Sequence, residues 1–117
     1  MQLTMMKSKL HKATVTDADL NYEGSISIDP TLCDQAQLLQ FEQVDIYNVN
    51  NGARFTTYVI YGKPGEICLN GAAARHVQKG DKVIIVSYAN FEQAEAINHK
   101  PIALLLDDNN KVKGESF

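Results

Sequence analysis

The sequence predicts a mainly β fold of one domain, a small closed barrel or sandwich. About seven short segments rich in β-branched and aromatic residues follow one another at close spacing, separated by turn signals. Only one or two segments have room for a helix, too few to supply the crossovers of a doubly wound parallel sheet. The length of 117 residues and the hydrophobic content of 44% are those of a single domain over residues 1–117.

Alternating apolar and polar residues predict the first strand at residues 10–16. If this strand begins at Lys9, then Lys9 and His11 share a face. The second strand covers residues 22–28 and ends at an Asp-Pro pair. Such a pair is typical of a helix start, because aspartate caps the first turn and proline suits it. We therefore expect a short helix at residues 31–39.

The strongest hairpin signal is Asn51-Gly52, because this pair suits the tight turn between antiparallel strands. It lies between two segments of β-forming residues, 44–49 and 53–61, which we expect to pair. The remaining expected elements, in chain order, are a turn at 62–65, a strand at 66–69, a helical turn at 70–74, a buried strand at 82–88, a helical turn at 91–97, a strand at 102–106 and a frayed polar tail at 107–117.

The chain carries 11 Lys and Arg against 14 Asp and Glu, a net charge of −3. No nucleic-acid partner is expected, because neutralising phosphates takes a clustered excess of cations. No membrane partner is expected, since no apolar run approaches the roughly 20 residues that cross a bilayer. Residues 1–10 lack the apolar segment of a secretory signal, so we expect a cytoplasmic protein. Cys33 and Cys68 can in principle pair, but reduced core thiols are more common in such a chain.

Several familiar kinds of site have no support in the sequence. No Gly-x-Gly-x-x-Gly or Walker motif indicates a nucleotide, and no Gly-x-Ser-x-Gly indicates a hydrolase nucleophile. The three histidines and two cysteines do not fall at the spacings of a zinc site, so no metal is expected.

What remains is a set of short motifs spread along the chain: Lys9-Leu10-His11, Tyr22-Glu23-Gly24-Ser25, Asn51-Gly52, Arg54-Phe55-Thr56-Thr57-Tyr58 and Asn70-Gly71-Ala72-Ala73-Ala74. With these motifs in this order and spacing, the chain resembles the pyruvoyl-dependent aspartate 1-decarboxylases, which make β-alanine for pantothenate synthesis. The resemblance implies a double-psi β-barrel with short helices, assembled as a homotetramer with its sites between neighbouring subunits. Two departures are Tyr47, where some relatives carry tryptophan, and a short loop at 62–66.

The resemblance further implies a proenzyme that cuts itself between Gly24 and Ser25, into residues 1–24 and 25–117. The Ser25 hydroxyl attacks the Gly24 carbonyl to give an ester, and elimination and hydrolysis then leave a pyruvoyl group derived from Ser25. Glycine suits the first position because its backbone reaches conformations closed to other residues. The new ketone condenses with the amine of L-aspartate and accepts the electron pair released as CO₂ departs. Maturation with a helper protein and without one both fit the sequence.

Three side chains are the main candidates for handling the substrate. Arg54 suits a carboxylate because a guanidinium makes two parallel hydrogen bonds. Lys9 is implied to help neutralise the dianion, which a chain of net charge −3 attracts only through local cations. Tyr58 is the candidate proton donor, because a phenol keeps its proton at neutral pH. The ordinary alternatives are solvated surface charges for Arg54 and Lys9 and a packed strand aromatic for Tyr58.

The resemblance also places Thr57 near the cut, where it assists self-cleavage. Strict alternation points Thr57 away from Tyr58, so either the strand is bulged there or the two residues face different neighbours. The Asn70 turn predicts a helix start, whose free N–H groups can receive a carboxylate, or a helix cap alone. His11 and Tyr22 are lesser candidates that fit the site or ordinary packing. The implied substrate-binding set is Lys9, His11, Arg54, Thr57, Asn70, Gly71, Ala72 and Ala73.

Two other functions remain open at the level of the sequence. One is a non-catalytic small-anion-binding β-barrel that uses Arg54 and the Asn70 turn, with Gly24-Ser25 an ordinary turn. The other is a pyruvoyl-dependent decarboxylase for a different amino acid.

Overall fold

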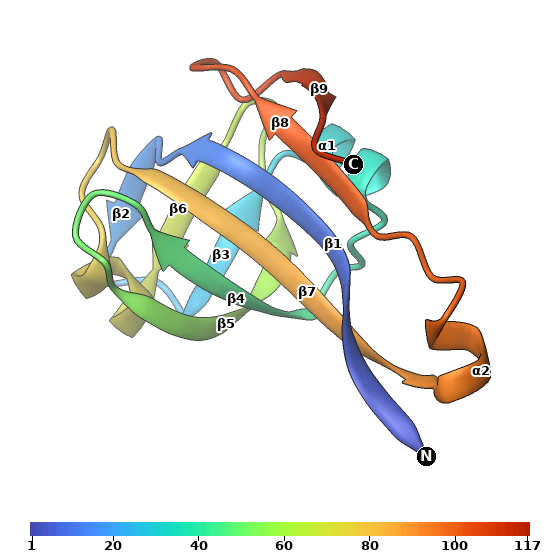
Figure 1. Ribbon diagram of the computed structural model, residues 1–117. Helices are drawn as coiled ribbons and strands as arrows, with labels where there is room; N and C mark the ends of the chain where they lie inside the picture. The colour runs from blue at the N-terminus through green and yellow to red at the C-terminus, as the bar shows by residue number, and fades with distance from the viewer.

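Nine strands form one strongly curved sheet in the computed structural model, which describes residues 1–117 (Figure 1). The strands are β1 (Gln2–Thr14), β2 (Asp17–Asp19), β3 (Ser25–Ile28), β4 (Gln43–Asn48), β5 (Arg54–Tyr61), β6 (Ile67–Asn70), β7 (Lys82–Glu92), β8 (Ile102–Leu106) and β9 (Val112–Glu115). The helices are α1 (Pro30–Ala36), α2 (Gln93–Ala96) and a 3₁₀ helix, η1 (Gly71–His76). The prediction of a mainly β fold is confirmed.

The strand order across the sheet is β2-β6-β3-β5-β4-β7-β1-β8-β9. The expected hairpin is present, because β4 and β5 pair antiparallel around Asn51-Gly52. β1 lies between β7, which it pairs antiparallel, and β8, which it pairs parallel. It begins well before the expected strand, since β7 is long enough to pair with its first residues. A register shift between Leu10 and Ala13, with Lys12 at φ +61°, then bends β1.

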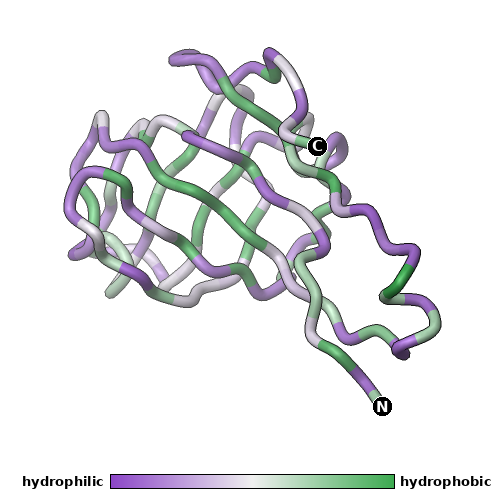
Figure 2. The backbone as a smooth tube through the Cα atoms, viewed as in Figure 1, coloured by the Kyte–Doolittle hydropathy of each residue, from purple (hydrophilic) through white to green (hydrophobic).

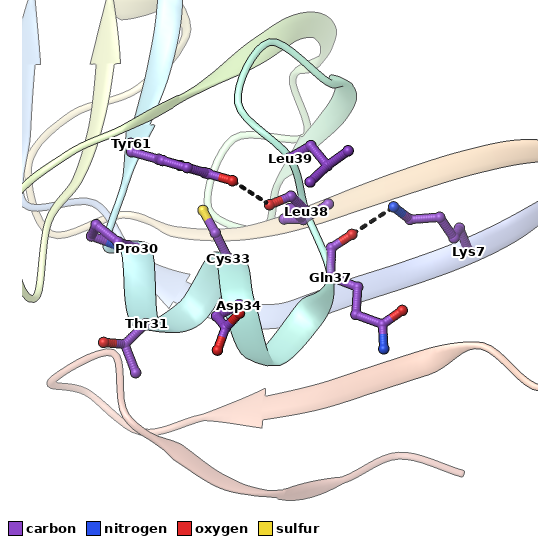
Figure 3. Close-up of a pocket in the computed structure, with 9 residues that line it drawn as sticks. All are labelled: Lys7, Pro30, Thr31, Cys33, Asp34, Gln37, Leu38, Leu39 and Tyr61. Carbon is purple, nitrogen blue, oxygen red and sulfur yellow. Dashed lines mark hydrogen bonds between the residues drawn. The ribbon is translucent and has the colours of Figure 1, made fainter.

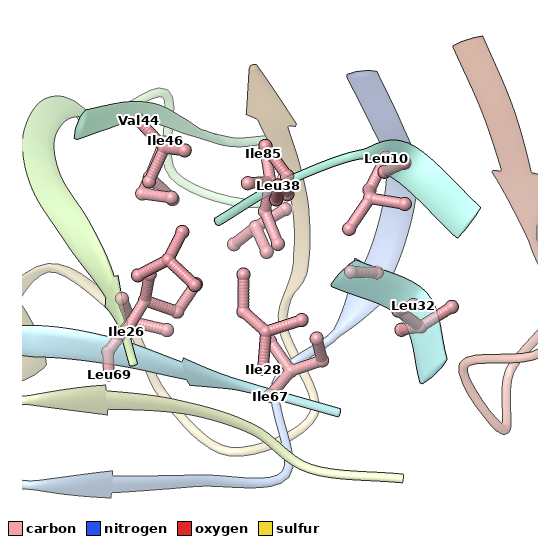
Figure 4. Close-up of a cluster of buried hydrophobic side chains, with 14 of the residues drawn as sticks. Leu10, Ile26, Ile28, Leu32, Leu38, Val44, Ile46, Ile67, Leu69 and Ile85 are labelled. Atoms are coloured by element: carbon pink, nitrogen blue, oxygen red, sulfur yellow. The ribbon is translucent and has the colours of Figure 1, made fainter. Parts of the chain in front are cut away.

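The concave side of the sheet holds the core (Figure 4). Aliphatic side chains from β1, β3, β4, β6 and β7 meet there. Many are fully buried, among them Leu10, Ile26, Ile28, Ile46, Ile67, Leu69 and Ile85. Each such side chain contributes roughly 1.5–3 kcal/mol relative to an exposed one. Figure 2 shows the same division along the chain, with apolar stretches in the strands and polar residues in the connecting loops.

α1 covers one end of this core, with Leu32, Cys33 and Ala36 buried. The Asp29 carboxylate accepts a hydrogen bond from Thr31 N–H at 2.8 Å, which confirms the expected helix cap. The helix ends before residue 39, because Gln37 adopts a left-handed conformation with φ +56°.

The expectation of a frayed tail is wrong. Residues 112–115 form β9, which pairs antiparallel with β8. Asn110 anchors the turn before β9, because its Oδ1 accepts a hydrogen bond from Thr14 N–H at 2.7 Å and its Nδ2 donates to Thr14 O at 2.9 Å. The side chain is buried and in effect continues the hydrogen bonding of β1.

We expect Asn110→Ala to lower the free energy of unfolding by about 2–4 kcal/mol, because it leaves the N–H and C=O of Thr14 without a partner. Urea denaturation measures this loss. Asn109→Ala, at the exposed neighbour, should change the free energy of unfolding by less than about 0.5 kcal/mol. Equal effects of the two substitutions would contradict the anchoring role.

Candidate active site

Ser25 begins β3 and is fully buried, whereas Gly24 before it is exposed. In the antiparallel register of β3 and β6, Ser25 lies opposite Asn70. Asn70 Nδ2 donates a hydrogen bond to Ser25 Oγ at 2.9 Å, and Ser25 Oγ donates to Glu23 O at 3.0 Å. The Gly24–Ser25 peptide therefore lies where an exposed turn enters a buried strand, with the serine hydroxyl held on both sides.

Gly71 holds the start of η1 against this turn. Its φ is +65°, and a Cβ added to it would lie 2.6 Å from Gly24 N and 2.9 Å from Tyr22 O. Both neighbours are backbone atoms, which cannot move aside cheaply, so only glycine fits. The close approach of these two backbones places the Asn70 turn directly against the Gly24–Ser25 peptide.

A cavity of about 320 Å³ opens beside Gly24. It is lined by Gly24, Phe55, Thr56, Thr57, Tyr58, Ala72, Ala73 and His76. β5 pairs with β3 only from Val59 onward, so the edge of β5 before that residue is free on this side. The cavity runs along this free edge, which is why consecutive residues line it. β4 and β5 pair from Arg54 to Tyr58 without a register shift, so a bulge does not bring Thr57 and Tyr58 together.

Comparison with known proteins gives a consistent result over nearly the whole chain. The family model described as aspartate decarboxylase matches residues 1–113. The chain belongs to the aspartate decarboxylase family. An aspartate 1-decarboxylase of Bdellovibrio bacteriovorus is 61% identical over 96% of this chain and 90% of its own length. One of Syntrophus aciditrophicus is 61% identical over 97% and 99%, and one of Clostridium kluyveri is 54% identical over 96% and 90%. The family resemblance and the expectation of a decarboxylase are confirmed.

Within this decarboxylase chain, the structure brings part of the expected site together. Gly24, Thr57, Tyr58, Ala72 and Ala73 all line the cavity. The remaining members of this group, Ser25, Asn70 and Gly71, lie immediately behind it through the contacts described above.

The two expected cations lie outside the cavity. The Arg54 guanidinium carbon lies 3.8 Å from the centre of the Tyr47 ring, a cation–π contact on the exposed side of β5. The Tyr47 hydroxyl in turn shares a 2.9 Å hydrogen bond with the Tyr88 hydroxyl. Lys9 Nζ lies 5.6 Å from the ring centre of Phe117. A single chain therefore does not unite Lys9 or Arg54 with Gly24.

His11 and Tyr22 also lie apart from the cavity lining. Burial lowers the pKa of His11, and the charges of Lys9 and Lys12 lower it further. His11 Nδ1 is buried without a hydrogen-bond partner. Tyr22 is exposed beside the turn that leads to Gly24.

The site expected from the sequence lacks three residues of the cavity, Phe55, Thr56 and His76. The rings of Phe55 and His76 stack with centroids 4.7 Å apart and planes 23° apart. His76 follows Ala73 by three residues, and in a 3₁₀ helix that spacing returns to the same face. The spacing from Ala73 could therefore have indicated His76, but only if this segment were already known to be a 3₁₀ helix.

A larger cavity of about 680 Å³ lies elsewhere, between α1 and the strands beside it (Figure 3). Lys7 Nζ there donates to Gln37 O at 2.6 Å and pairs with Glu42 at 2.8 Å. Burial opposes ionisation of Glu42, but hydrogen bonds from Leu39 N–H, Lys7 and Ser87 outweigh it and hold the Glu42 pKa below its usual range. None of the residues expected in the active site lines this cavity, so we assign the site to the cavity at Gly24.

No group of three His, Cys, Asp or Glu side chains is arranged to hold a metal ion. No helix has the length and apolar character needed to cross a membrane.

Proposed function

We propose that this member of the aspartate decarboxylase family cuts its own chain between Gly24 and Ser25 and converts L-aspartate into β-alanine and CO₂. The observation that carries the proposal is the buried Ser25 hydroxyl, held by Asn70 at 2.9 Å. It belongs to the peptide whose other member, Gly24, lines a cavity together with Thr57 and Tyr58.

The proposed cut uses groups of this chain and water. Ser25 Oγ adds to the Gly24 carbonyl carbon, and its proton passes to the Ser25 nitrogen. The bond from that carbon to the nitrogen then breaks to leave an ester and a free amine. Loss of the Ser25 Cα proton then expels the Gly24 carboxylate and leaves dehydroalanine. Tautomerisation, addition of water and loss of ammonia yield the pyruvoyl group. Thr57 lines the cavity beside Gly24, which suits its hydroxyl to stabilise the carbonyl oxygen as negative charge develops.

The surroundings of Ser25 fit a pyruvoyl group. Asn70 Nδ2 already donates to the side-chain oxygen at this position, and the Gly71 backbone packs against Gly24 without a side chain between them. When formed, the group supplies a ketone that accepts the electron pair released as CO₂ leaves. Tyr58 holds the proton for the carbon that loses CO₂. Phe55, Ala72 and Ala73 give the cavity an apolar part of its lining.

The oligomeric state and the barrel topology of the chain are also part of this proposal. Aspartate carries two carboxylates, yet no Lys or Arg lines the cavity beside Gly24. We therefore infer that Lys9 and Arg54 complete sites between neighbouring subunits, in the homotetramer that the family resemblance implies. The cytoplasmic location expected from the sequence is part of the same proposal. A double-psi β-barrel is supported by the chain after β1, because Thr16 N–H donates to Ile67 O at 2.8 Å. This contact links the segment that follows β1, the third strand from one end of the order, to β6, the second strand from the other end.

Mass spectrometry of the purified protein, combined with turnover assays, tests the proposal. We expect two chains, residues 1–24 and residues 25–117, the second lighter than its serine form by the mass of ammonia. L-Aspartate should be consumed and L-glutamate should not. An uncut chain that still releases CO₂ would refute the mechanism, and equal rates for the two amino acids would refute the substrate. An uncut chain that binds small anions without turnover would favour the non-catalytic barrel.

A further inference from the structure

A chain of hydrogen bonds runs from Cys68 to Ser25. Cys68 Sγ lies 3.2 Å from Asn70 Oδ1, and Asn70 Nδ2 donates to Ser25 Oγ at 2.9 Å and to Ser27 Oγ at 3.0 Å. The antiparallel register of β3 and β6 produces this arrangement, because it sets Ser25 opposite Asn70 and Ser27 opposite Cys68. Cys68, Asn70 and Ser25 are all buried, and Ser27, Cys68 and Asn70 also line a cavity of about 490 Å³.

The Cys68 thiol determines which way round the Asn70 amide lies in this series of hydrogen bonds. A hydroxyl both donates and accepts, so Ser25 and Ser27 alone would accommodate either end of the Asn70 amide. Burial, together with the charges of Glu66, Asp17 and Asp19, raises the pKa of Cys68 to about 11, so the sulfur keeps its proton. A protonated thiol donates and is only a weak acceptor. It therefore favours the amide oxygen on its own side, which turns the amide nitrogen toward the two serines.

We propose that Cys68 is a positioning residue for self-cleavage, because its S–H bond to Asn70 Oδ1 selects the amide orientation that presents Nδ2 to Ser25 Oγ. This role rests on the proposed function. In this orientation Ser25 Oγ accepts from Asn70 and directs its own proton to Glu23 O. An N–H donor at Oγ stabilises the oxygen as it loses that proton during the attack on Gly24. With the amide reversed, Oγ instead faces an acceptor and loses that stabilisation.

The test follows the rate at which newly synthesised 117-residue chain is cut, on a denaturing gel. Cys68→Ala and Cys68→Val remove the donor, the second without any loss of volume, and both should be cut about 3- to 10-fold more slowly. Cys68→Ser keeps a donor but can also accept, so it should be cut at a rate between those of the wild-type and Cys68→Ala chains. Cys33→Ala is the matched control, because Cys33 is the other buried thiol and donates only to Ile28 O, at 4.0 Å. We expect it to be cut at the wild-type rate.

A second background separates positioning from a general loss of packing. If Cys68 acts through the Asn70 amide, Cys68→Ala should add no further slowing in an Asn70→Ala chain. The same slowing in both backgrounds would overturn the proposal, and so would a Cys68→Ser chain as slow as Cys68→Ala. A wild-type chain that stays whole overturns the proposed function together with this role. A wild-type chain that is cut, with both donor-free variants cut equally fast, overturns the role of Cys68 alone.

Discussion

A Ser25→Ala chain is expected to remain whole and to release no CO₂ from L-aspartate. The methyl group has no oxygen to attack the Gly24 carbonyl, so neither the ester nor the ketone derived from it can form. Alanine is smaller than serine, so it fits the same space. Asn70 Nδ2 keeps its second acceptor, Ser27 Oγ, so we expect the fold to persist. A denaturing gel for the cut and a CO₂ assay for turnover measure the two losses separately.

Ser27→Ala is the control for this experiment, since it removes the other hydroxyl bound by the same amide. It should still yield residues 1–24 and 25–117, because the attacking hydroxyl of Ser25 is retained. Recovery of both pieces from the Ser25→Ala chain would show that the Ser25 hydroxyl is not the attacking group.

Gly71→Ala should slow the cut on the order of 100-fold, because displacements near 1 Å at a reacting centre have effects of this size. The new Cβ would lie 2.6 Å from Gly24 N and 2.7 Å from Gly24 Cα. One of the two backbones must therefore shift, and the shift falls on the peptide that is to be cut. The measurement is the fraction of cut chain against time, with a thermal unfolding midpoint to show that the variant is folded.

Gly52→Ala separates this steric effect from backbone strain. Gly52 also has a positive φ, +77°, but nothing lies within 4 Å of an added Cβ. We expect a loss of about 1–2 kcal/mol in stability from the left-handed conformation and an unchanged rate of cutting. If both glycine variants slow the cut alike, strain rather than contact with Gly24 explains the result.

Local signals in the sequence predicted the elements whose cause is local. The Asp29 cap, the Asn51-Gly52 hairpin and the apolar run in β7 all appear in the structure. The local sequence does not predict β9, because its residues are polar and become a strand only by pairing with β8. The first half of β1 depends in the same way on the length of β7.

The same distinction between local and long-range causes applies to the candidate site. The motifs point to Gly24, Ser25, Thr57 and the Asn70 turn. The fold places Gly24 and Thr57 in the lining of one cavity, with Ser25 and Asn70 directly behind it. Cys68 could not be recognised from the sequence, because its relation to Ser25 passes through Asn70 and the β3–β6 register. The sequence makes Arg54 and Lys9 candidates through their charge, but charge alone does not predict that both lie outside the cavity lining.

If the chain is cut as proposed, the position of β1 has a consequence for the lifetime of the protein. Residues 1–24 carry a strand that is hydrogen-bonded on one side to β7 and on the other to β8. Once severed, this segment stays docked as a separate peptide, and melting becomes a dissociation whose midpoint rises with protein concentration. Heating that releases the peptide is hard to reverse, because dilution separates the partners and the broken link cannot be rejoined.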